Sequence, residues 1–405
     1  MRVVVIGSGI VGASAAYYLS GRGATVTVVD GGYQGEATQA GAGIVCPWVD
    51  HPEDDAWYQL TREGARHYPG LVEELGEDIG YAKVGALLVA EDPADLEPVR
   101  ALLLRRRLDA PEMGDITDVA APAELFPPLS DTLSAILVPG AARVDGRSVR
   151  DALLHAAIAR GAEVRTGAAA LTPDGEVYLY ALPAEGATPP AADITPPSAG
   201  TGPPAGEASS RQATTVPPPA TGSARRFAGQ AVRIEADMVI VAAGAWTGEV
   251  CRPLGVELPV FPRRGQILHA TLEGVDTAWW PIVLPSVGPY LLGFPDSRVV
   301  IGATVEDVGF APRVTMGGLE EVIAAGLRIA PGLHGATVTE TRVGLRPVYA
   351  PGSALIGPLT GRVVVATGLG SYGLTAGPFT GRIAAALALG EQPPLDITPY
   401  APPVA

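Results

Sequence analysis

The stretch RVVVIGSGIVGASAAYYL, residues 2–19, joins a short apolar run to a helical pattern through three glycines. Gly7, Gly9 and Gly12 have the spacing G-x-G-x-x-G, which is typical of a dinucleotide-binding turn between a strand and a helix. In such a turn the first glycine permits the bend, the second lets the main chain approach a pyrophosphate, and the third allows close helix packing. The helix that follows presents its amino end to the phosphates.

A second apolar run, from Val26 to Val29, ends at Asp30. A carboxylate at the end of the second strand can accept hydrogen bonds from both ribose hydroxyls of a nucleotide, and it repels the 2′-phosphate of NADP. The two runs and the helix between them therefore predict a strand-helix-strand unit that binds a nucleotide other than NADP. An ordinary turn with a solvated Asp30 is the alternative.

Three further glycine-rich stretches follow apolar runs. They are ATQAGAGIVCPW (37–48), MVIVAAGAWTGEV (238–250) and VVVATGLGSYGLTAGPFTGRIAAALALG (363–390). Flexible surface loops have no reason to follow buried strands, and several strand ends that converge on one ligand suit a long flavin dinucleotide better than a single NAD half-site. We therefore expect FAD as the cofactor.

Composition indicates the number of domains, the kind of partner and the cellular environment. The chain has 405 residues, 47% of them hydrophobic, and a formal net charge of −15. This size allows two or three domains, and the acidic balance favours a small-molecule partner over nucleic acid or an anionic membrane. Only Cys46 and Cys251 are present, without metal-ligand spacing, so we expect no metal site and a reducing, cytoplasmic environment. Neither a transmembrane stretch nor a secretory signal is predicted.

Residues 183–224 differ from the rest because they consist mostly of Pro, Ala, Gly, Ser and Thr. Such a segment buries too little apolar surface to offset its ordering entropy. We expect a disordered insert between two strands, with a docking site for a partner as the alternative.

In their order and spacing, the motifs of this chain resemble those of the D-amino-acid oxidase superfamily of FAD-dependent oxidoreductases, especially the glycine oxidase, sarcosine oxidase and D-amino-acid dehydrogenase branch. Besides the opening stretch and the last glycine-rich stretch, the motifs are AGAGIV (40–45), RVDGRSVRDALLHAA (143–157), ADMVIVAAGAW (236–246), RRGQIL (263–268), VIGATVED (300–307) and GLRPVYAPGSALIGPL (344–359).

The resemblance implies an α/β fold with a Rossmann-like FAD-binding domain built from discontinuous segments, plus an α+β substrate domain with a mixed sheet. The stretches YAKVGALLVA, FPRRGQILHATL and RVVIGATVE resemble strands of that sheet. The implied FAD-binding segments are 1–80, 142–258 and 341–405, and the implied substrate segments are 81–141 and 259–340. The last helix is predicted over Pro378–Leu389, and another over Arg147–Arg160.

The predicted cofactor residues are named here together. They are Gly7, Gly9, Ile10, Val11, Gly12, Asp30, Gly31, Thr38, Ala40, Gly41, Ala42, Gly43, Ile44, Ala243, Gly244, Trp246, Gly368, Gly370, Ser371, Tyr372, Gly373 and Leu374. No cysteine lies near Arg346 or Gly368, the positions relevant to covalent attachment, so the FAD is expected to be noncovalent.

The resemblance also implies that Arg346 binds a substrate carboxylate, for which a guanidinium offers a bidentate fork; a structural salt bridge is the alternative. Tyr372 and His51 are further candidates for the catalytic site, against packing on the flavin rim and a polar surface position. Glycine oxidases carry a tyrosine near Ile282, so Tyr290, Trp279 and Trp280 are possible substitutes. We interpret Cys46 as a small buried residue.

The expected reaction is oxidation of the Cα–N bond, or of an N-methyl group, of glycine, a D-amino acid or an N-alkyl glycine, which gives an imine that water hydrolyses. Oxidation of a 2-hydroxy acid is one alternative. Another is the flavin subunit of a hetero-oligomeric dehydrogenase that docks through the insert and AWWPIVLP (278–285). The electron acceptor, whether oxygen, a quinone or a partner protein, is left open, as are the substrate side chain and the oligomeric state.

Overall fold

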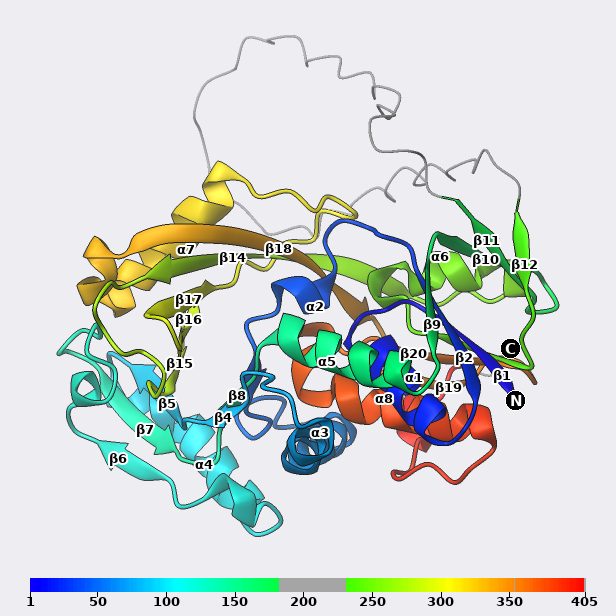
Figure 1. The fold of residues 1–405 in the computed structure, drawn as a ribbon. Helices are drawn as coiled ribbons and strands as arrows, with labels where there is room; N and C mark the ends of the chain where they lie inside the picture. The colour runs from blue at the N-terminus through cyan, green and yellow to red at the C-terminus, as the bar shows by residue number, and fades with distance from the viewer. Residues whose placement is uncertain (182–230, 353, 404–405) are drawn as a thin grey trace, which may run out of the picture.

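Two large β-sheets and the helices between them make up the computed structural model of the chain, which describes residues 1–181, 231–352 and 354–403 (Figure 1). The predicted insert 183–224 lies outside the described residues. The two sheets match the predicted combination of a Rossmann-like part and a mixed-sheet part, and this fold class is confirmed.

The first large sheet has the opening strand of the chain near its centre. Its order is β19-β20-β13-β1-β2-β9, with every neighbouring pair parallel except β19 and β20. The strands are β1 (Arg2–Ile6), β2 (Thr25–Asp30), β9 (Glu163–Thr166), β13 (Met238–Val241), β19 (Leu355–Pro358) and β20 (Val363–Thr367). The apolar runs predicted as buried parallel strands are thus found in one sheet.

Both faces of this sheet are covered, which explains why its strands are apolar without a break. On β1, Val3 and Val5 pack with helices α1, α5 and α8, whereas Val4 and Ile6 pack against a small antiparallel sheet on the other face. That small sheet comprises β10 (Ala168–Leu171), β11 (Val177–Tyr180) and β12 (Val232–Ile234). The helices are α1 (Ile10–Gly21), α2 (Ala37–Ala40), α3 (Asp55–Leu75), α4 (Glu97–Arg106), α5 (Gly146–Ala159), α6 (Thr247–Cys251), α7 (Met316–Ile329) and α8 (Gly373–Leu389).

Helix α8 begins at Gly373 rather than at Pro378, where the sequence predicts its start. A proline inside a helix has no N–H for the carbonyl four residues before it, which here belongs to Leu374. The hydroxyl of Tyr68, on α3, donates a hydrogen bond to that carbonyl. A tertiary contact therefore replaces the missing helical bond, and α8 reaches back to the cavity described below.

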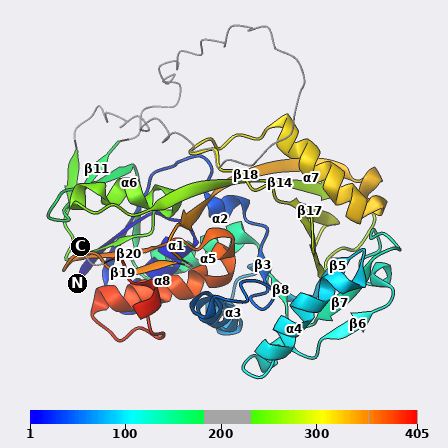
Figure 2. The same ribbon diagram turned by 180° about the vertical axis from the view of Figure 1, so that it is seen from behind.

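The second large sheet is mixed and has the order β18-β14-β17-β16-β15-β5-β7-β6, in which β15 and β5 run parallel. Its strands are β5 (Ala86–Ala90), β6 (Thr117–Val119), β7 (Ser134–Val138), β14 (Val260–Thr271), β15 (Ile282–Pro285), β16 (Tyr290–Phe294), β17 (Arg298–Gly302) and β18 (Thr337–Tyr349). The long strands β14 and β18 extend toward the first sheet, and α7 covers their outer side (Figure 2). A fourth sheet, also small, joins β3 (Ile44–Val45), β4 (Ala82–Lys83) and β8 (Ala142–Arg143).

The strands of the two large sheets come from alternating segments of the chain. The first sheet takes strands from 1–80, 142–258 and 341–405, and the second takes strands from 81–141 and 259–340. β18 crosses the position 340/341, where a boundary was predicted. The division into five segments stays a prediction.

The apolar stretch 278–285, considered above as a docking surface, is mostly inside the protein. Trp280, Ile282 and Val283 are buried, and only Trp279 among its large apolar side chains is exposed. The reason is that β15 lies between β16 and β5 within the sheet. The stretch therefore offers Trp279 as its one exposed large apolar side chain, and the docking alternative stays a prediction.

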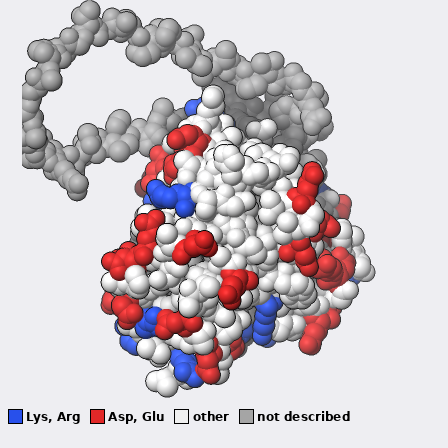
Figure 3. Space-filling view, turned by 90° about the vertical axis from the view of Figure 1, so that its left-hand side faces the viewer, with Lys and Arg blue, Asp and Glu red and all other residues white. Residues whose placement is uncertain are grey.

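Acidic groups are spread over the face of the molecule shown in Figure 3, with fewer basic groups between them. This distribution agrees with the net charge of −15. In the described part of the chain, no helix is both long enough and apolar enough to cross a membrane.

Candidate functional site

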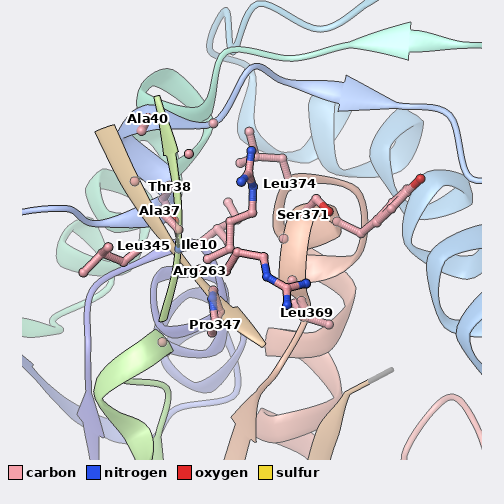
Figure 4. Close-up of a pocket in the computed structure, with 18 of the residues that line it drawn as sticks. Ile10, Ala37, Thr38, Ala40, Arg263, Leu345, Pro347, Leu369, Ser371 and Leu374 are labelled. Carbon is pink, nitrogen blue, oxygen red and sulfur yellow. Dashed lines mark hydrogen bonds between the residues drawn. The ribbon is translucent and has the colours of Figure 1, made fainter. Parts of the chain in front are cut away.

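A cavity of about 770 Å³ is lined by residues of both large sheets. One side is formed by the carboxyl ends of β1, β2, β13 and β20 together with the start of α8, and the other by β5 and the strands β14 to β18. Figure 4 shows Thr38, Leu345 and Ser371, which come from three distant segments, around this space. Ligands of open α/β sheets bind at such carboxyl ends, so this cavity is the candidate site.

Nearly all predicted cofactor residues line this cavity. They are Gly7, Gly9, Ile10, Val11, Asp30, Gly31, Thr38, Ala40, Gly41, Ala42, Gly43, Ile44, Ala243, Gly244, Trp246, Gly368, Gly370, Ser371, Tyr372, Gly373 and Leu374. Gly12 is the exception, because it lies behind the turn and against the main chain of Gly7. A Cβ at Gly12 would lie 1.9 Å from the Gly7 carbonyl oxygen, so its place is explained by helix packing rather than by ligand contact.

The turn before α1 fits a pyrophosphate. Gly7 has a φ of +105°, and a Cβ there would lie 2.4 Å from the carbonyl oxygen of Ala242, so the turn requires glycine. Gly9 precedes the helix without a capping side chain, and the first turn of α1 has no acidic residue. The amino end of α1 therefore offers N–H groups and a positive dipole end to an anion. The Thr38 hydroxyl oxygen accepts a hydrogen bond from one of these N–H groups, that of Ile10, at 3.0 Å.

Asp30 lies at the cavity wall and belongs to a small polar network. Its carboxylate accepts hydrogen bonds from the Ser8 hydroxyl, from the Gly32 N–H at 2.8 Å and from the Arg150 guanidinium at 3.3 Å. Arg150, on α5, also donates to the Ser8 carbonyl oxygen at 3.0 Å. Sequence reasoning missed Arg150, although it lies inside the motif RVDGRSVR. The network fixes the carboxylate at the end of β2, beside the phosphate-binding turn.

Two arginines of neighbouring strands line the opposite side of the cavity, and they differ in their partners. Arg263 and Arg346 face each other across β14 and β18. Arg263 forms a two-pronged ion pair with Asp307, at 2.8 and 3.0 Å. Arg346 forms no ion pair within the described residues and donates to the carbonyl oxygens of Thr304, at 3.0 Å, and Arg264, at 3.4 Å. Its guanidinium is therefore free to bind a carboxylate.

Tyr290 lies in the cavity near Arg346, whereas Ile282 is fully buried in the sheet. Burial raises the pKa of Tyr290 to about 12, and the neighbouring Arg346 offsets only part of this rise. The phenol therefore keeps its proton at neutral pH and acts as a hydrogen-bond donor. Of the three candidate substitutes for the missing tyrosine, the structure brings Tyr290 to Arg346; Trp279 and Trp280 do not line the cavity.

Tyr372 lines the cavity, and His51 does not. The Tyr372 hydroxyl donates to a carboxylate oxygen of Asp50, and its ring meets that of Trp57 edge-on at 4.3 Å. The exposed His51 stacks on Trp57 at 4.1 Å, which leaves its ring outside the cavity wall. The structure thus brings Tyr372, but not His51, to the candidate site, with Asp50 in the place predicted for His51.

Apolar side chains also line the cavity. They include Leu88, Leu96, Val99, Ile267 and Leu284. Cys46 also lines the cavity, is almost fully buried, and has a pKa that burial raises to about 12. Its thiol therefore stays protonated. Across the described ranges, no group of three or more His, Cys, Asp or Glu side chains is arranged to hold a metal ion.

The fit between cavity and cofactor agrees with comparisons to known proteins. The sequence profile of the FAD dependent oxidoreductases (DAO) matches residues 2–194 and 205–387. The uncharacterized oxidoreductase YurR of Bacillus subtilis is 40% identical over 413 residues, which cover 98% of each chain. Glycine oxidase of Pseudomonas putida is 28% identical over 408 residues, or 99% of this chain and 98% of the relative.

A solved structure is also similar over the full length. The crystal structure of iminodiacetate oxidase from Chelativorans sp. BNC1 has 42% sequence identity to this chain, covers 99% of both chains and superposes with a TM-score of 0.84. The glycine-rich cradle, the family match and these relatives agree on one cofactor, FAD. The chain therefore belongs to the family of FAD-dependent oxidoreductases (DAO).

Proposed function

We propose that this chain oxidises the C–N bond of a small amino acid or an N-substituted glycine, with the substrate carboxylate held by Arg346. The observation that carries this proposal is the guanidinium of Arg346, which lies in the cavity without an ion pair, beside the Tyr290 hydroxyl, a hydrogen-bond donor. A partly buried cation without a counter-ion is unfavourable, and a ligand carboxylate supplies the missing charge. The relatives named above, glycine oxidase and iminodiacetate oxidase, act by name on substrates with an amine one carbon from a carboxylate.

The residues of this chain supply binding and orientation. Arg346 and Tyr290 hold the carboxylate end, and the apolar residues Leu88, Ile267 and Leu284 exclude water from the reacting carbon. Bound FAD would supply the two-electron acceptor for a hydride from the substrate carbon. The substrate ammonium group first loses a proton to solvent, the neutral amine then gives up the hydride from the neighbouring carbon, and the resulting protonated imine is hydrolysed by water to a carbonyl compound and an amine or ammonia. No side chain need serve as an obligatory base in this scheme.

The cofactor cradle would hold FAD through its main chain. The N–H groups at the start of α1 would meet the pyrophosphate, and Asp30 would meet the ribose of the adenosine half. The residues from Gly368 to Leu374 would line the flavin end. Because cysteine is absent from both the Arg346 and the Gly368 segments, we propose that the FAD is bound noncovalently.

The experiment that tests the proposal is an anaerobic absorbance titration of the purified holoenzyme. The panel comprises glycine, sarcosine, iminodiacetate, D- and L-amino acids, proline and 2-hydroxy acids. We expect an amino acid or N-substituted glycine to bleach the oxidised flavin band and to release ammonia or an amine. Bleaching by 2-hydroxy acids alone would overturn the proposal. Admission of air, and then of a quinone, identifies the electron acceptor.

A further inference from the structure

Besides Asp30, three carboxylates line the cavity without a place in the scheme above, those of Glu36, Asp50 and Asp95, and Asp50 is the one held by Tyr372. Asp50 lies in the loop between β3 and α3 and lines the same cavity as Arg346. We infer that Asp50 accepts a hydrogen bond from the substrate amine, so that the site recognises a zwitterion with Arg346 at its carboxylate end and Asp50 at its ammonium end. This inference rests on the proposed function and assigns its substrate class.

The two charged groups face one cavity without pairing with each other. Within the described part of the chain, neither Arg346 nor Asp50 forms an ion pair with any residue. The other arginine on the wall, Arg263, is already paired with Asp307. Opposite charges that line one cavity and stay apart are complementary to a ligand that carries both charges. Apolar side chains of the same cavity can receive the carbon atoms of such a ligand.

The hydrogen bonds of Asp50 leave room for a ligand. The Tyr372 hydroxyl donates to its Oδ2, and an ionised carboxylate can accept several hydrogen bonds. Burial and the Asp50 charge raise the pKa of Tyr372 well above its ordinary value, so the phenol remains a donor. The Tyr372 ring is in turn held edge-on by Trp57. Asp50 is therefore oriented by a donor on one oxygen, while the described residues give the other oxygen no hydrogen-bond donor.

Arg106 positions the loop without neutralising Asp50 by an ion pair. Only 7% of Arg106 is exposed, and its guanidinium donates to the main-chain oxygens of Trp48, Asp50 and His51 at 2.9, 2.7 and 2.9 Å. The ring of Tyr58 packs on the same guanidinium at 4.0 Å. A buried arginine that is satisfied by carbonyl oxygens fixes the loop but leaves the Asp50 side chain for another partner. Arg106 is a positioning residue in this arrangement.

A carboxylate contact also bears on the choice between amino acids and hydroxy acids. An ammonium group is attracted by the charge of Asp50, whereas the hydroxyl of a 2-hydroxy acid is neutral and gains only a hydrogen bond. The site therefore favours an amino acid over the hydroxy acid of the same shape.

The test compares ligands with and without the amine in an isosteric variant. Asp50→Asn keeps the shape and removes the charge. We expect it to weaken binding of the reducing amino acid about 10- to 100-fold in anaerobic flavin titrations, because charge-assisted hydrogen bonds are roughly twice as strong as neutral ones. Binding of acetate, followed by the shift of the flavin spectrum, should change less than about twofold, because acetate has no amine. Glu53→Gln removes an exposed charge from the same loop and should alter neither.

Equal loss of amino-acid and acetate binding in Asp50→Asn would overturn the inference, and so would unchanged binding of both. If Asp50→Asn does not retain FAD, Tyr372→Phe gives the same test by removing the donor to Asp50, with an expected loss of about 3- to 10-fold for the amino acid alone. Arg106→Met should show the same selective loss, partly restored in Arg106→Lys. A wild-type enzyme that no amino acid reduces would instead defeat the proposed function itself.

Discussion

The two sides of the cavity are built by different means. The cofactor side is mostly main chain: the turn at Gly7, the amino end of α1 and the glycine-rich start of α8 present backbone groups to the ligand. The proposed substrate side is mostly side chain, with Arg346, Tyr290 and Asp50 from three separate segments. Main-chain recognition suits a constant ligand such as FAD, whereas side chains on a sheet and a loop can be exchanged to fit different substrates.

The comparison predicts that a substitution on the cofactor side abolishes both FAD binding and substrate oxidation. In Gly12→Val a side chain would press on the main chain of Gly7, and overpacking costs about 1–3 kcal/mol or more. We expect FAD affinity to fall at least 10- to 100-fold, so that the protein is purified largely without flavin. The ratio of flavin to protein absorbance measures the effect. Gly335→Ala, in open space, is the control and should keep its flavin.

A substrate-side lesion should leave the cofactor in place. Arg346→Met removes the one guanidinium that lines the cavity without an ion pair among the described residues, and hydrogen bonds to charged groups contribute about 1.5–3 kcal/mol each. We expect amino-acid and acetate binding to weaken about 100-fold while flavin content is unchanged. Arg105→Ala, an exposed arginine, is the matched control. Flavin loss in Arg346→Met would contradict the separation between the two sides.

A smaller effect is expected where packing supports the cofactor side from outside the cavity. Tyr68→Phe removes the donor to the Leu374 carbonyl, and an unsatisfied buried acceptor costs about 1–3 kcal/mol. We expect the free energy of unfolding in urea to fall by that amount with little change in substrate binding. Pro378→Ala restores an N–H four residues after Leu374, so the double variant should recover most of the loss. No recovery would show that this hydrogen bond does not explain the position of α8.

The smallest effect concerns the pH dependence of the substrate side. The Arg264 guanidinium, with Gln266 and Thr304, lowers the pKa of Glu306 to about 2, against an ordinary value of 4.5. Because the folded pKa is depressed, the stability that Glu306 contributes is present above about pH 4.5 and is lost as the pH falls toward 2. We expect Glu306→Gln to destabilise by about 1 kcal/mol at pH 7, since water screens this partly exposed group.

Urea midpoints at pH 7 and pH 3.5 measure this difference. The gap between wild type and Glu306→Gln should narrow at the lower pH. Glu320→Gln, which changes an exposed carboxylate on α7, should show no gap at either pH. A stability difference between wild type and Glu306→Gln that grows at pH 3.5 would contradict the predicted direction of the pH dependence.

Much of the cofactor side could be predicted because its requirements are local. Gly7, Asp30 and the segment from Gly368 to Leu374 each follow a buried strand, and a parallel sheet brings such strand ends to one edge. Arg150 was missed because its contact with Asp30 joins α5 to β2, and no local pattern reports that pairing. The start of α8 was misplaced for the same reason, since the hydroxyl that allows Pro378 in the helix comes from α3.

The substrate side was predicted less completely. Arg346 was predicted through the family resemblance. Its lack of an ion pair could not be predicted, because it depends on Asp307 pairing with Arg263 in the folded protein. His51 was singled out because it follows the stretch CPWVD, directly after the predicted cofactor loop. The loop instead turns Asp50 to the cavity, with Arg106 holding three of its carbonyl oxygens.

The sequence by itself determined the fold class and the family and predicted the residues that would contact FAD, because apolar strands and the glycines after them impose their geometry within a few residues. Only the tertiary structure decided which charged side chains remain unpaired in the cavity. That outcome depends on the register of β14 against β18 and on the packing of α4 against the loop before α3. Charge pairing between distant segments is a property of the packed protein, and no stretch of sequence specifies it alone.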